Sequence, residues 1–349
     1  MKITKTEISR INEINFDKLD FGKTFSDHML VCDYKNGSWR EPQIIPYQKL
    51  SFAPSTHVFH YGQAIFEGLK AFKNKKGEVL IFRPRENFLR LNKSAERLCM
   101  PTLPENIFMQ GIIELLKIDN KWIPVGKNKS LYIRPFFIST SEFIRATPSN
   151  DYMFAIITSP CSNYYSGEVN LKIEERYSRA VPGGVGFAKA AGNYAASFHP
   201  TKKAQENGFT QIIWTDSTEH KYIEESGTMN IMFRINNELI TPKLTDTILS
   251  GITRKSILEI AKSNGIKVLE KKITVKEIIN AAENNNLKEV FGLGTAVTIN
   301  EINSINYKGK KIILEPILGK DSYSKKLKKE LQDIQYGLKE DTYNWVMKI

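Results

Sequence analysis

The sequence predicts a mixed α/β (α+β) protein built from two domains. Its 349 residues exceed what one hydrophobic core usually organises, and 41% hydrophobic with 25% charged residues is an ordinary globular composition. Segments with helical periodicity alternate with short runs rich in aromatic and β-branched residues. Residues 159–170 combine proline, glycine, serine and asparagine, which is typical of a loop. We therefore expect a smaller N-terminal α/β domain over 1–158, an interdomain loop over 159–170, and a larger, β-rich C-terminal domain with helices over 171–349.

The N-terminal domain is expected to contain both strands and helices. Three segments rich in apolar, aromatic or β-branched residues predict strands: 78–82, 130–138 and 152–157. Residues 86–98 predict a helix with one apolar face, formed by Phe88, Leu91, Ala95 and Leu98. Residues 105–118 predict a second amphipathic helix.

The C-terminal domain is expected to be richer in strands. Strands are predicted at 211–214, 229–235 and 238–240, the last two joined by a hairpin turn at residues 236–237. A helix is expected from Gly251 to Asn264, with Gly265 as its C-cap. A further helix is expected over 275–285, and another carries Tyr323, Leu327, Leu331 and Ile334 at helical spacing.

The chain is basic, with 50 lysines and arginines, 38 acidic residues and a net charge of +12. Such a charge is compatible with a nucleic-acid-binding protein that has no catalytic activity, and this alternative stays open. Lysines cluster at residues 73–76, 308–311 and 325–329. The first two clusters are predicted turns and the third is a predicted solvated helix face, so we expect no nucleic-acid partner.

The compartment is predicted from what the sequence lacks. No stretch has the length of a membrane span, and the first residues have no signal-peptide core. Cys32, Cys99 and Cys161 are widely spaced, without a CxxC pair. His57 and His60 have no partner at metal-ligand spacing, so no metal is expected. We expect a cytoplasmic protein with no membrane partner.

Lys189 lies in the run PGGVGFAKAAGNY (182–194), where four glycines and mostly small or apolar residues surround one lysine. Apolar surroundings disfavour the charged form of an amine. A neutral amine is a nucleophile and can form a Schiff base with a carbonyl group. The run therefore indicates an active-site amine, while an ordinary loop lysine is the alternative.

A Schiff-base lysine indicates pyridoxal 5'-phosphate if the chain also supplies a carboxylate for the pyridine nitrogen and an anion site for the phosphate. Glu225 is a carboxylate candidate, because it precedes a small turn that leads into a buried strand, and Glu224 competes with it. Two turns offer backbone amides to a phosphate, residues 250–254 at a helix start and residues 291–297. Arg90 would add a guanidinium.

Taken in order, these segments resemble the class IV pyridoxal-phosphate aminotransferases, and most closely the branched-chain amino acid aminotransferases. The resemblance covers nearly the whole chain. It is carried by HYG to FEGLKAF (60–72), FRP (82–84), the helix with Arg90, YIRP (132–135), KAAGNY (189–194), ESGTMN (225–230), SGITR (250–254) and GLGTA (292–296). It implies a two-domain fold-type IV enzyme whose larger C-terminal domain binds pyridoxal 5'-phosphate.

The resemblance implies a role toward the cofactor for each matched residue. Lys189 would bear the Schiff base and shuttle a proton between the substrate α-carbon and the cofactor C4′. Glu225, rather than Glu224, would pair with the pyridine nitrogen, and Tyr194 would hydrogen-bond the ring oxygen. The phosphate would be held by Arg90, the amides of Ile252 and Thr253, and Thr295.

The resemblance also implies a pocket for two kinds of substrate. The α-carboxylate would lie against the backbone near Thr228, Thr295 and Ala296. Phe66, Tyr61 and Tyr132 would form apolar walls, and Tyr164 would close over them. Arg134 and the tyrosine hydroxyls would receive the γ-carboxylate of glutamate. A largely aromatic pocket would therefore still contain the polar groups that this second substrate needs.

The implied reaction is transamination of L-leucine, L-isoleucine and L-valine with 2-oxoglutarate by a ping-pong mechanism. Its products are branched-chain 2-oxo acids and L-glutamate. The near-equilibrium reaction also runs in reverse, which is the direction of branched-chain amino acid biosynthesis, and the sequence does not say which direction predominates. The resemblance further implies a homodimer. A D-amino acid aminotransferase or an aminodeoxychorismate lyase of the same fold is the alternative, although those relatives are usually shorter.

Overall fold

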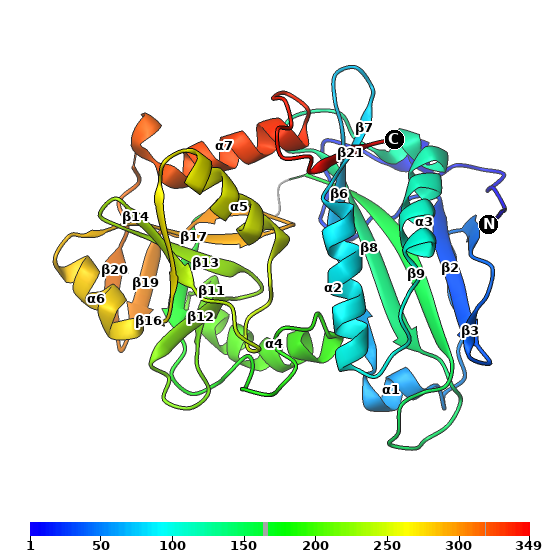
Figure 1. Cartoon of the computed structure of the whole chain (residues 1–349), viewed down its shortest axis with the longest axis horizontal. Helices are drawn as coiled ribbons and strands as arrows, with labels where there is room; N and C mark the ends of the chain where they lie inside the picture. The colour runs from blue at the N-terminus through cyan, green and yellow to red at the C-terminus, as the bar shows by residue number, and fades with distance from the viewer. Residues whose placement is uncertain (163–166, 318) are drawn as a thin grey trace. The chain divides into compact units, whose positions relative to one another are not determined.

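A computed structural model describes residues 1–162, 167–317 and 319–349 (Figure 1). Contacts between residues divide the chain into two compact units, each of which is described by itself. The first comprises Met1–Tyr164, Ala188–Gly192 and Ile334–Ile349, and the second comprises Tyr165–Phe187 and Asn193–Asp333. The mixed α/β class is confirmed, whereas the domain division at 159–170 stays a prediction. Two segments expected in the C-terminal domain, 188–192 and 334–349, group with the first unit.

The first unit is built on a largely antiparallel sheet. Its strands are β1 (Lys2–Ile3), β2 (His28–Lys35), β3 (Ser38–Trp39), β4 (Gln43–Pro46), β5 (Ala64–Phe66), β6 (Leu69–Lys73), β7 (Val79–Phe82), β8 (Ser130–Ser139), β9 (Tyr152–Cys161) and β21 (Val346–Lys348). They follow the order β1-β4-β2-β9-β8-β6-β7-β21, with β3 paired to β2 and β5 paired to β8. The strands predicted from the apolar runs are confirmed as β7, β8 and β9.

Strand β9 is longer than its sequence pattern predicts. Residues 159–161, expected to open the interdomain loop, belong to this strand instead, and Cys161 lies opposite Ser130 on β8. Pro160 has no amide proton to donate to a neighbouring strand. It is tolerated because β2 pairs with β9 only before this residue, and the last hydrogen bond on that side runs from the amide of Ser26 to the carbonyl of Thr158.

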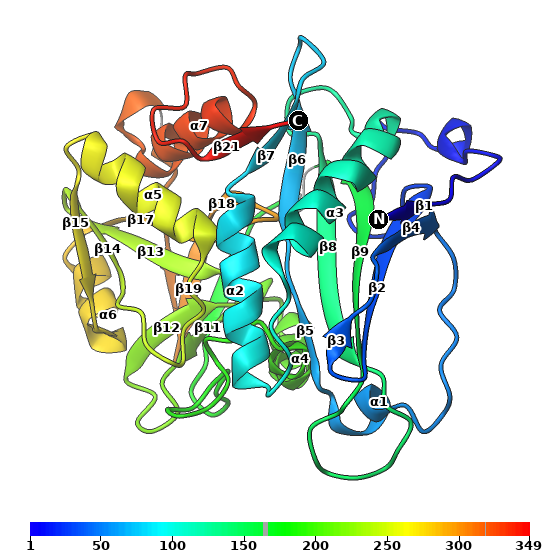
Figure 2. The same cartoon turned by 45° about the vertical axis from the view of Figure 1, so that its right-hand side comes forward.

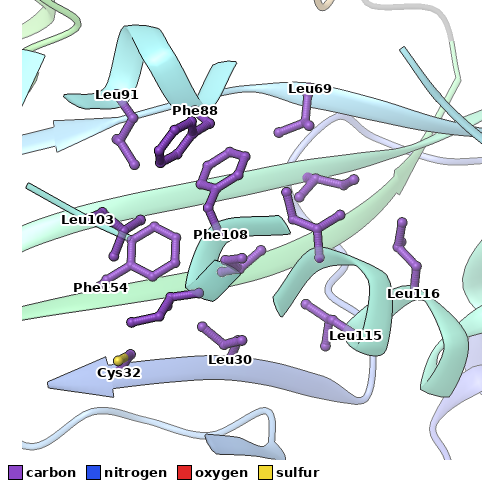
Figure 3. Close-up of a cluster of buried hydrophobic side chains, with 14 of the residues drawn as sticks. Leu30, Cys32, Leu69, Phe88, Leu91, Leu103, Phe108, Leu115, Leu116 and Phe154 are labelled. Atoms are coloured by element: carbon purple, nitrogen blue, oxygen red, sulfur yellow. The ribbon is translucent and has the colours of Figure 1, made fainter. Parts of the chain in front are cut away.

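Helices of the first unit are α1 (His57–Tyr61), α2 (Pro84–Arg97) and α3 (Glu105–Ile118). Figures 1 and 2 show α2 and α3 lying across one face of the sheet. In Figure 3, Phe88 of α2 and Phe108 of α3 point toward Leu30 and Phe154 on the sheet. Because Phe108 and Phe154 are fully buried, this core fixes the apolar helix faces that the sequence predicts.

The C-terminal residues extend the sheet of the first unit. Strand β21 pairs with β7 (Figure 2). The carbonyl of Trp345 accepts a hydrogen bond from the amide of Arg83 at 2.7 Å, and the Arg83 guanidinium lies 4.8 Å from the centroid of the Trp345 ring. Since Arg83 directly precedes α2, the chain end secures the start of that helix.

The second unit contains two sheets. The first has the order β16-β12-β11-β10-β19-β20, and the second β15-β14-β13-β17-β18. Their strands are β10 (Asn170–Ile173), β11 (Gln211–Thr215), β12 (Tyr222–Ser226), β13 (Asn230–Ile235), β14 (Glu238–Pro242), β15 (Lys267–Lys271), β16 (Ile273–Thr274), β17 (Leu287–Gly294), β18 (Thr298–Glu301), β19 (Ser304–Tyr307) and β20 (Lys310–Ile313). Ser226 pairs with Met229, so the chain passes from one sheet to the other in a tight turn directly after β12.

The remaining helices are α4 (Ala191–Glu206), which starts in residues grouped with the first unit, α5 (Ile252–Ser263), α6 (Val275–Glu283) and α7 (Tyr323–Gln335). Helix α5 packs on β15 and β17, and α6 on β16 and β17. The three helices predicted in this region are confirmed as α5, α6 and α7. On α7, Leu327 and Leu331 are buried whereas Lys325, Lys326 and Lys329 are exposed, so most of this lysine cluster is solvated. Lys328 is half-buried, and burial lowers its pKa. Over the described residues, no helix has the length and hydropathy to cross a membrane.

Candidate active site

Lys189 is anchored at both of its backbone groups within the first unit. Its amide donates to Oγ of Ser94 on α2 at 2.9 Å, and its carbonyl accepts from the amide of Phe66 at 3.1 Å. The next residue, Ala190, forms a β-bridge with Ile65. Nζ of Lys189 lies 4.7 Å from the centroid of the Phe66 ring. The backbone of Lys189 is therefore fixed between α2 and β5, and its amine lies beside an aromatic ring.

The glycines before Lys189 allow close packing of backbone in the second unit. A Cβ on Gly186 would lie 2.5 Å from Cβ of Ala180 and 2.7 Å from the carbonyl oxygen of Thr247. Arg179 donates to the carbonyl oxygens of both Gly186 and Thr247. The space beside Gly186 is thus filled by neighbouring chain, and this glycine serves the packing of its own loop.

Phe66, Tyr132 and Arg134, three of the predicted pocket residues, lie together with Lys189. Cζ of Arg134 lies 4.5 Å from the centroid of the same Phe66 ring. Nη2 of Arg134 donates to the Tyr132 hydroxyl at 3.0 Å. Nε of Arg134 is buried and has no hydrogen-bond partner among the described residues. A buried donor of this kind is satisfied by an anionic ligand such as a carboxylate.

Two other predicted pocket residues do not join this group. Tyr61 ends α1, is 40% exposed and packs on the ring of His57. The His57 ring hydrogen-bonds to the hydroxyl of Ser139 and the carbonyl of Thr147. In the described ranges, no group of three or more His, Cys, Asp and Glu side chains could hold a metal ion. Tyr164, expected to close over the pocket, lies outside the described residues.

Arg90 pairs with a fully buried carboxylate, Glu67. Nε and Nη2 of Arg90 donate to Oε1 and Oε2 of Glu67 at 2.7 and 2.8 Å. Nδ2 of Asn87 and the amide of Gly68 also donate to Oε2, at 2.7 and 3.1 Å. Burial raises the pKa of Glu67, but the charges of Arg90 and Lys189 together with the hydrogen bonds hold that pKa below its ordinary value.

Glu225 is buried at the end of β12 in the second unit. Its Oε1 accepts from the amide of Leu249 at 2.9 Å and from Nδ2 of Asn230 at 3.1 Å. Its Oε2 lies 2.7 Å from Nε of Arg179, an ion pair without the geometry of a hydrogen bond. Both members of the ion pair are largely shielded from solvent, so the carboxylate is held in one orientation.

Glu224, the competing carboxylate, has a different environment. Its Oε1 accepts from Oγ1 of Thr247 at 2.5 Å, whereas its buried Oε2 has no hydrogen-bond partner in the described part of the chain. Burial raises the pKa of Glu224, although the hydrogen bond from Thr247 and the charge of Arg179 oppose that shift. The pairing of β12 with β11 shifts register between Trp214 and Thr215, so Glu224 is the unpaired residue of a β-bulge beside Glu225. The charge of Arg179 acts on both carboxylates, but only Glu225 forms an ion pair with it.

Asn230 links Glu225 to the predicted phosphate turn. A Cβ on Gly251 would lie 1.9 Å from Oδ1 of Asn230, so a larger residue there would displace the Asn230 side chain. Gly251 is the N-cap of α5 and provides no side-chain cap. The amides of Ile252 and Thr253 have no intrahelical acceptor in this first turn, and such amides attract anions. Nδ2 of Asn230, which donates to Glu225, also donates to the carbonyl of Leu249 just before this turn, so Asn230 connects the buried carboxylate to the chain that leads into α5.

The other predicted residues of the second unit lie in two turns and on α4. Thr228 is exposed in the turn that joins β12 to β13. Thr295 and Ala296 lie in the turn between β17 and β18, which Gly294 and Thr298 close as a pair. Tyr194 is half-buried in the first turn of α4.

Sequence reasoning missed five residues that hold these groups in place: Glu67, Asn87, Ser94, Arg179 and Asn230. Four of them had a signal: Asn87 and Ser94 lie three residues before and four residues after Arg90 on one helical face, and Glu67 and Asn230 belong to matched segments. Glu67 directly follows Phe66 in a matched segment. Arg179 had none, since the loop that brings it to Glu225 has no periodicity.

The chain is similar to known proteins in both sequence and fold. The family described as amino-transferase class IV matches residues 64–305. Branched-chain-amino-acid transaminase 1 of Bacillus subtilis (strain 168) is 45% identical over 337 residues, which cover 95% of this chain and 94% of that one. The solved branched-chain aminotransferase of Thermoproteus uzoniensis with norvaline has a TM-score of 0.75 at 24% identity, covering 92% of this chain and 99% of that one. A solved T.th. branched-chain amino acid aminotransferase with pyridoxamine 5'-phosphate has a TM-score of 0.74 at 22% identity, covering 93% of this chain and 99% of that one. Both solved structures share the fold.

Proposed function

This chain belongs to the class IV amino-transferase family, and we propose that it transfers the amino group of L-leucine, L-isoleucine and L-valine to 2-oxoglutarate. The products are branched-chain 2-oxo acids and L-glutamate. The names of the curated relatives support this substrate class. One observation carries the proposal: Nζ of Lys189 and the guanidinium of Arg134 lie on the same Phe66 ring. A reactive amine and a carboxylate receptor then lie beside the same aromatic ring.

The proposed cofactor is pyridoxal 5'-phosphate. Class IV membership supports it, as does the pyridoxamine 5'-phosphate in the solved T.th. structure. The donor set of this chain fits each part of that molecule. The amine of Lys189 suits the aldehyde, the buried Glu225 suits the pyridine nitrogen, and the Tyr194 hydroxyl suits the ring oxygen. The phosphate would be held by Arg90, the amides of Ile252 and Thr253, and Thr295.

The chain's own residues would then divide the work of proton transfer. The bound cofactor supplies an electron sink that lets the substrate α-carbon lose a proton. Nζ of Lys189 would take that proton and deliver it to C4′ of the cofactor, acting as a general base and then a general acid within one half-reaction, and the second half-reaction would reverse the transfer. Glu225, fixed by Arg179 and Asn230, keeps the pyridine nitrogen protonated. The same groups serve leucine and 2-oxoglutarate in turn, which makes the kinetics ping-pong.

The proposed pocket handles two unlike side chains with one set of walls. Phe66 and Tyr132 contact the branched apolar side chain. Arg134 and the Tyr132 hydroxyl, joined at 3.0 Å, bind the γ-carboxylate of glutamate. The α-carboxylate lies against the backbone near Thr228, Thr295 and Ala296.

The proposal extends to a cytoplasmic homodimer that acts in branched-chain amino acid biosynthesis. Phe59 and Tyr61, exposed on the same short helix, support a subunit interface there. Cys32, Cys99 and Cys161 are free thiols, which suits a reducing compartment. Light scattering on the purified protein tests the dimer, and a mass of 39.9 kDa would contradict it.

Borohydride trapping tests the proposed cofactor and lysine. The purified protein is expected to be yellow, and reduction should abolish its visible absorbance and leave a pyridoxyl adduct on Lys189 in mass spectrometry. Lys189→Ala should fold but show no turnover. An adduct on another lysine would overturn the assignment of Lys189. Activity on D-alanine without activity on L-leucine would replace the substrate proposal by that of a D-amino acid aminotransferase.

A further inference from the structure

Glu67 is a buried charged group to which the proposed mechanism gives no task. Its carboxylate is fully buried and accepts hydrogen bonds from Arg90, Asn87 and the amide of Gly68. A buried carboxylate is costly unless it is paired and hydrogen-bonded, and an apolar side chain of similar size could fill such a position more cheaply. Its presence therefore points to a requirement beyond packing.

The geometry shows what Glu67 does to Arg90. Two parallel bonds, Nε to Oε1 at 2.7 Å and Nη2 to Oε2 at 2.8 Å, fix the plane of the guanidinium as well as its position. A third donor, Nδ2 of Asn87, fixes the carboxylate in turn from the same helix. An arginine side chain loses considerable rotamer entropy when it binds an anion, and anchoring beforehand removes that cost.

The helix that carries Arg90 also carries the anchor of Lys189. Oγ of Ser94 accepts a hydrogen bond from the Lys189 amide and donates one to the carbonyl of Arg90 at 3.0 Å. A guanidinium fixed on α2 is therefore fixed relative to the backbone of the reactive lysine. A cofactor held by its aldehyde and by its phosphate needs that spacing to be constant.

We propose that Glu67 is a positioning residue that fixes the Arg90 guanidinium for the cofactor phosphate. This inference rests on the proposed function, because it takes the phosphate of pyridoxal 5'-phosphate as the anion. Two effects of Glu67 oppose each other: its position organises Arg90, and its negative charge repels a phosphate. Positioning is the larger effect, so loss of the carboxylate weakens phosphate binding although the site becomes more positive.

The test compares pyridoxal 5'-phosphate with pyridoxal, which lacks the phosphate. Dissociation constants for both are measured on the cofactor-free full chain, and their ratio reports the phosphate contribution alone. In Glu67→Gln an amide donor faces the donors of Arg90, so one of the two parallel bonds is lost. The preference for pyridoxal 5'-phosphate should fall about tenfold or more. An unchanged or increased preference would overturn the inference.

Three further variants complete the experiment. Glu67→Asp keeps the charge but is too short to make both bonds, so the preference should fall here too, and this variant decides the matter if Glu67→Gln does not fold. Arg90→Lys should lower the preference for pyridoxal 5'-phosphate, and the double variant Arg90→Lys/Glu67→Gln should lower that preference little further.

Asp119→Asn is the control, because it changes a buried carboxylate that does not contact Arg90 but pairs with His28 at 2.7 Å. It should lower the melting temperature without changing the preference. If the wild type binds neither compound, the proposed function fails; if it prefers the phosphate form and Glu67→Gln keeps that preference, only this inference fails.

Discussion

The backbone amide of Lys189 donates a hydrogen bond to the hydroxyl of Ser94, 2.9 Å away on α2. Ser94→Ala leaves this amide without its acceptor, at a cost of about 1–3 kcal/mol. We expect kcat to fall about tenfold, because the amine loses its fixed position, while borohydride still traps the adduct on Lys189. The measurement is steady-state kinetics with L-leucine and 2-oxoglutarate.

Ser263 offers a matched control for that variant. Its hydroxyl donates to the carbonyl of Ile260 at 2.9 Å, much as the Ser94 hydroxyl donates to Arg90. Ser263→Ala should leave kcat unchanged. Equal kinetics for Ser94→Ala and Ser263→Ala would remove any role for Ser94 beyond helix packing.

Gly68→Ala is expected to separate the two substrates. A Cβ at this position would lie 2.0 Å from the Tyr132 hydroxyl, which Arg134 binds at 3.0 Å. The tyrosine must move, so Arg134 loses its partner and the carboxylate receptor is distorted. KM for 2-oxoglutarate should rise about tenfold, whereas KM for L-leucine should change less.

Tyr132→Phe provides the comparison, because it removes only the hydroxyl. It should reproduce the selective rise in KM for 2-oxoglutarate in smaller measure. An equal rise for both substrates in either variant would show that Tyr132 and Arg134 form a general wall of the pocket, without a preference for carboxylates.

Arg179→Met is expected to destabilise the protein. Arg179 and Glu225 form a buried ion pair at 2.7 Å, and removing one partner of such a pair typically costs about 3 kcal/mol or more. Urea unfolding measures the loss. The double variant Arg179→Met/Glu225→Gln should recover a large part of it, because no unpaired buried charge remains.

An exposed cation serves as the control for Arg179. Lys262 lies 4.0 Å from Glu270 and is well exposed, so Lys262→Met should change the unfolding free energy by less than about 1 kcal/mol. If Arg179→Met behaves like Lys262→Met, the ion pair between Arg179 and Glu225 adds nothing measurable to the stability of the protein.

Most of the fold was predictable because periodicity reports directly on burial. The helix over 105–118 matches α3 because its apolar spacing is satisfied by one core around Phe108. Helix α4 was not predicted, since Gly192, Asn193 and Pro200 weaken the helical signal. Strand β21 was not predicted either, because three residues have no periodicity and their pairing with β7 is set by tertiary contact.

The candidate site was predictable only as a set of residues. Matched segments name Lys189, Arg90 and Glu225, and these residues do lie in ordered environments. Their partners, Glu67 and Arg179, are recognised only when the folded chain shows two charges at hydrogen-bonding distance. Such pairing depends on where strands and loops end in space, which local patterns do not encode.

The stability of the protein is expected to depend on pH through Glu224. Burial raises the pKa of this carboxyl above its ordinary value of 4.5, despite the hydrogen bond from Thr247. As the pH rises above 4.5, the unfolded chain loses this proton first and the folded chain keeps it. The folded state then binds more protons, so this group lowers the unfolding free energy with rising pH until the folded pKa is passed.

Glu224→Gln removes that dependence. The difference in unfolding free energy, variant minus wild type, should grow from pH 4.5 upward and then level off, as measured by urea unfolding at a series of pH values. Glu289→Gln is the control of opposite sign, because hydrogen bonds from Ser322 and Ser324 hold the pKa of Glu289 below its ordinary value in spite of burial. The unfolding free energy of the wild type should rise relative to that of Glu289→Gln as the pH rises from the lowered pKa of Glu289 to its ordinary value of 4.5. A pH-independent difference for Glu224→Gln would mean that Glu224 is as easily ionised in the folded protein as in the unfolded chain.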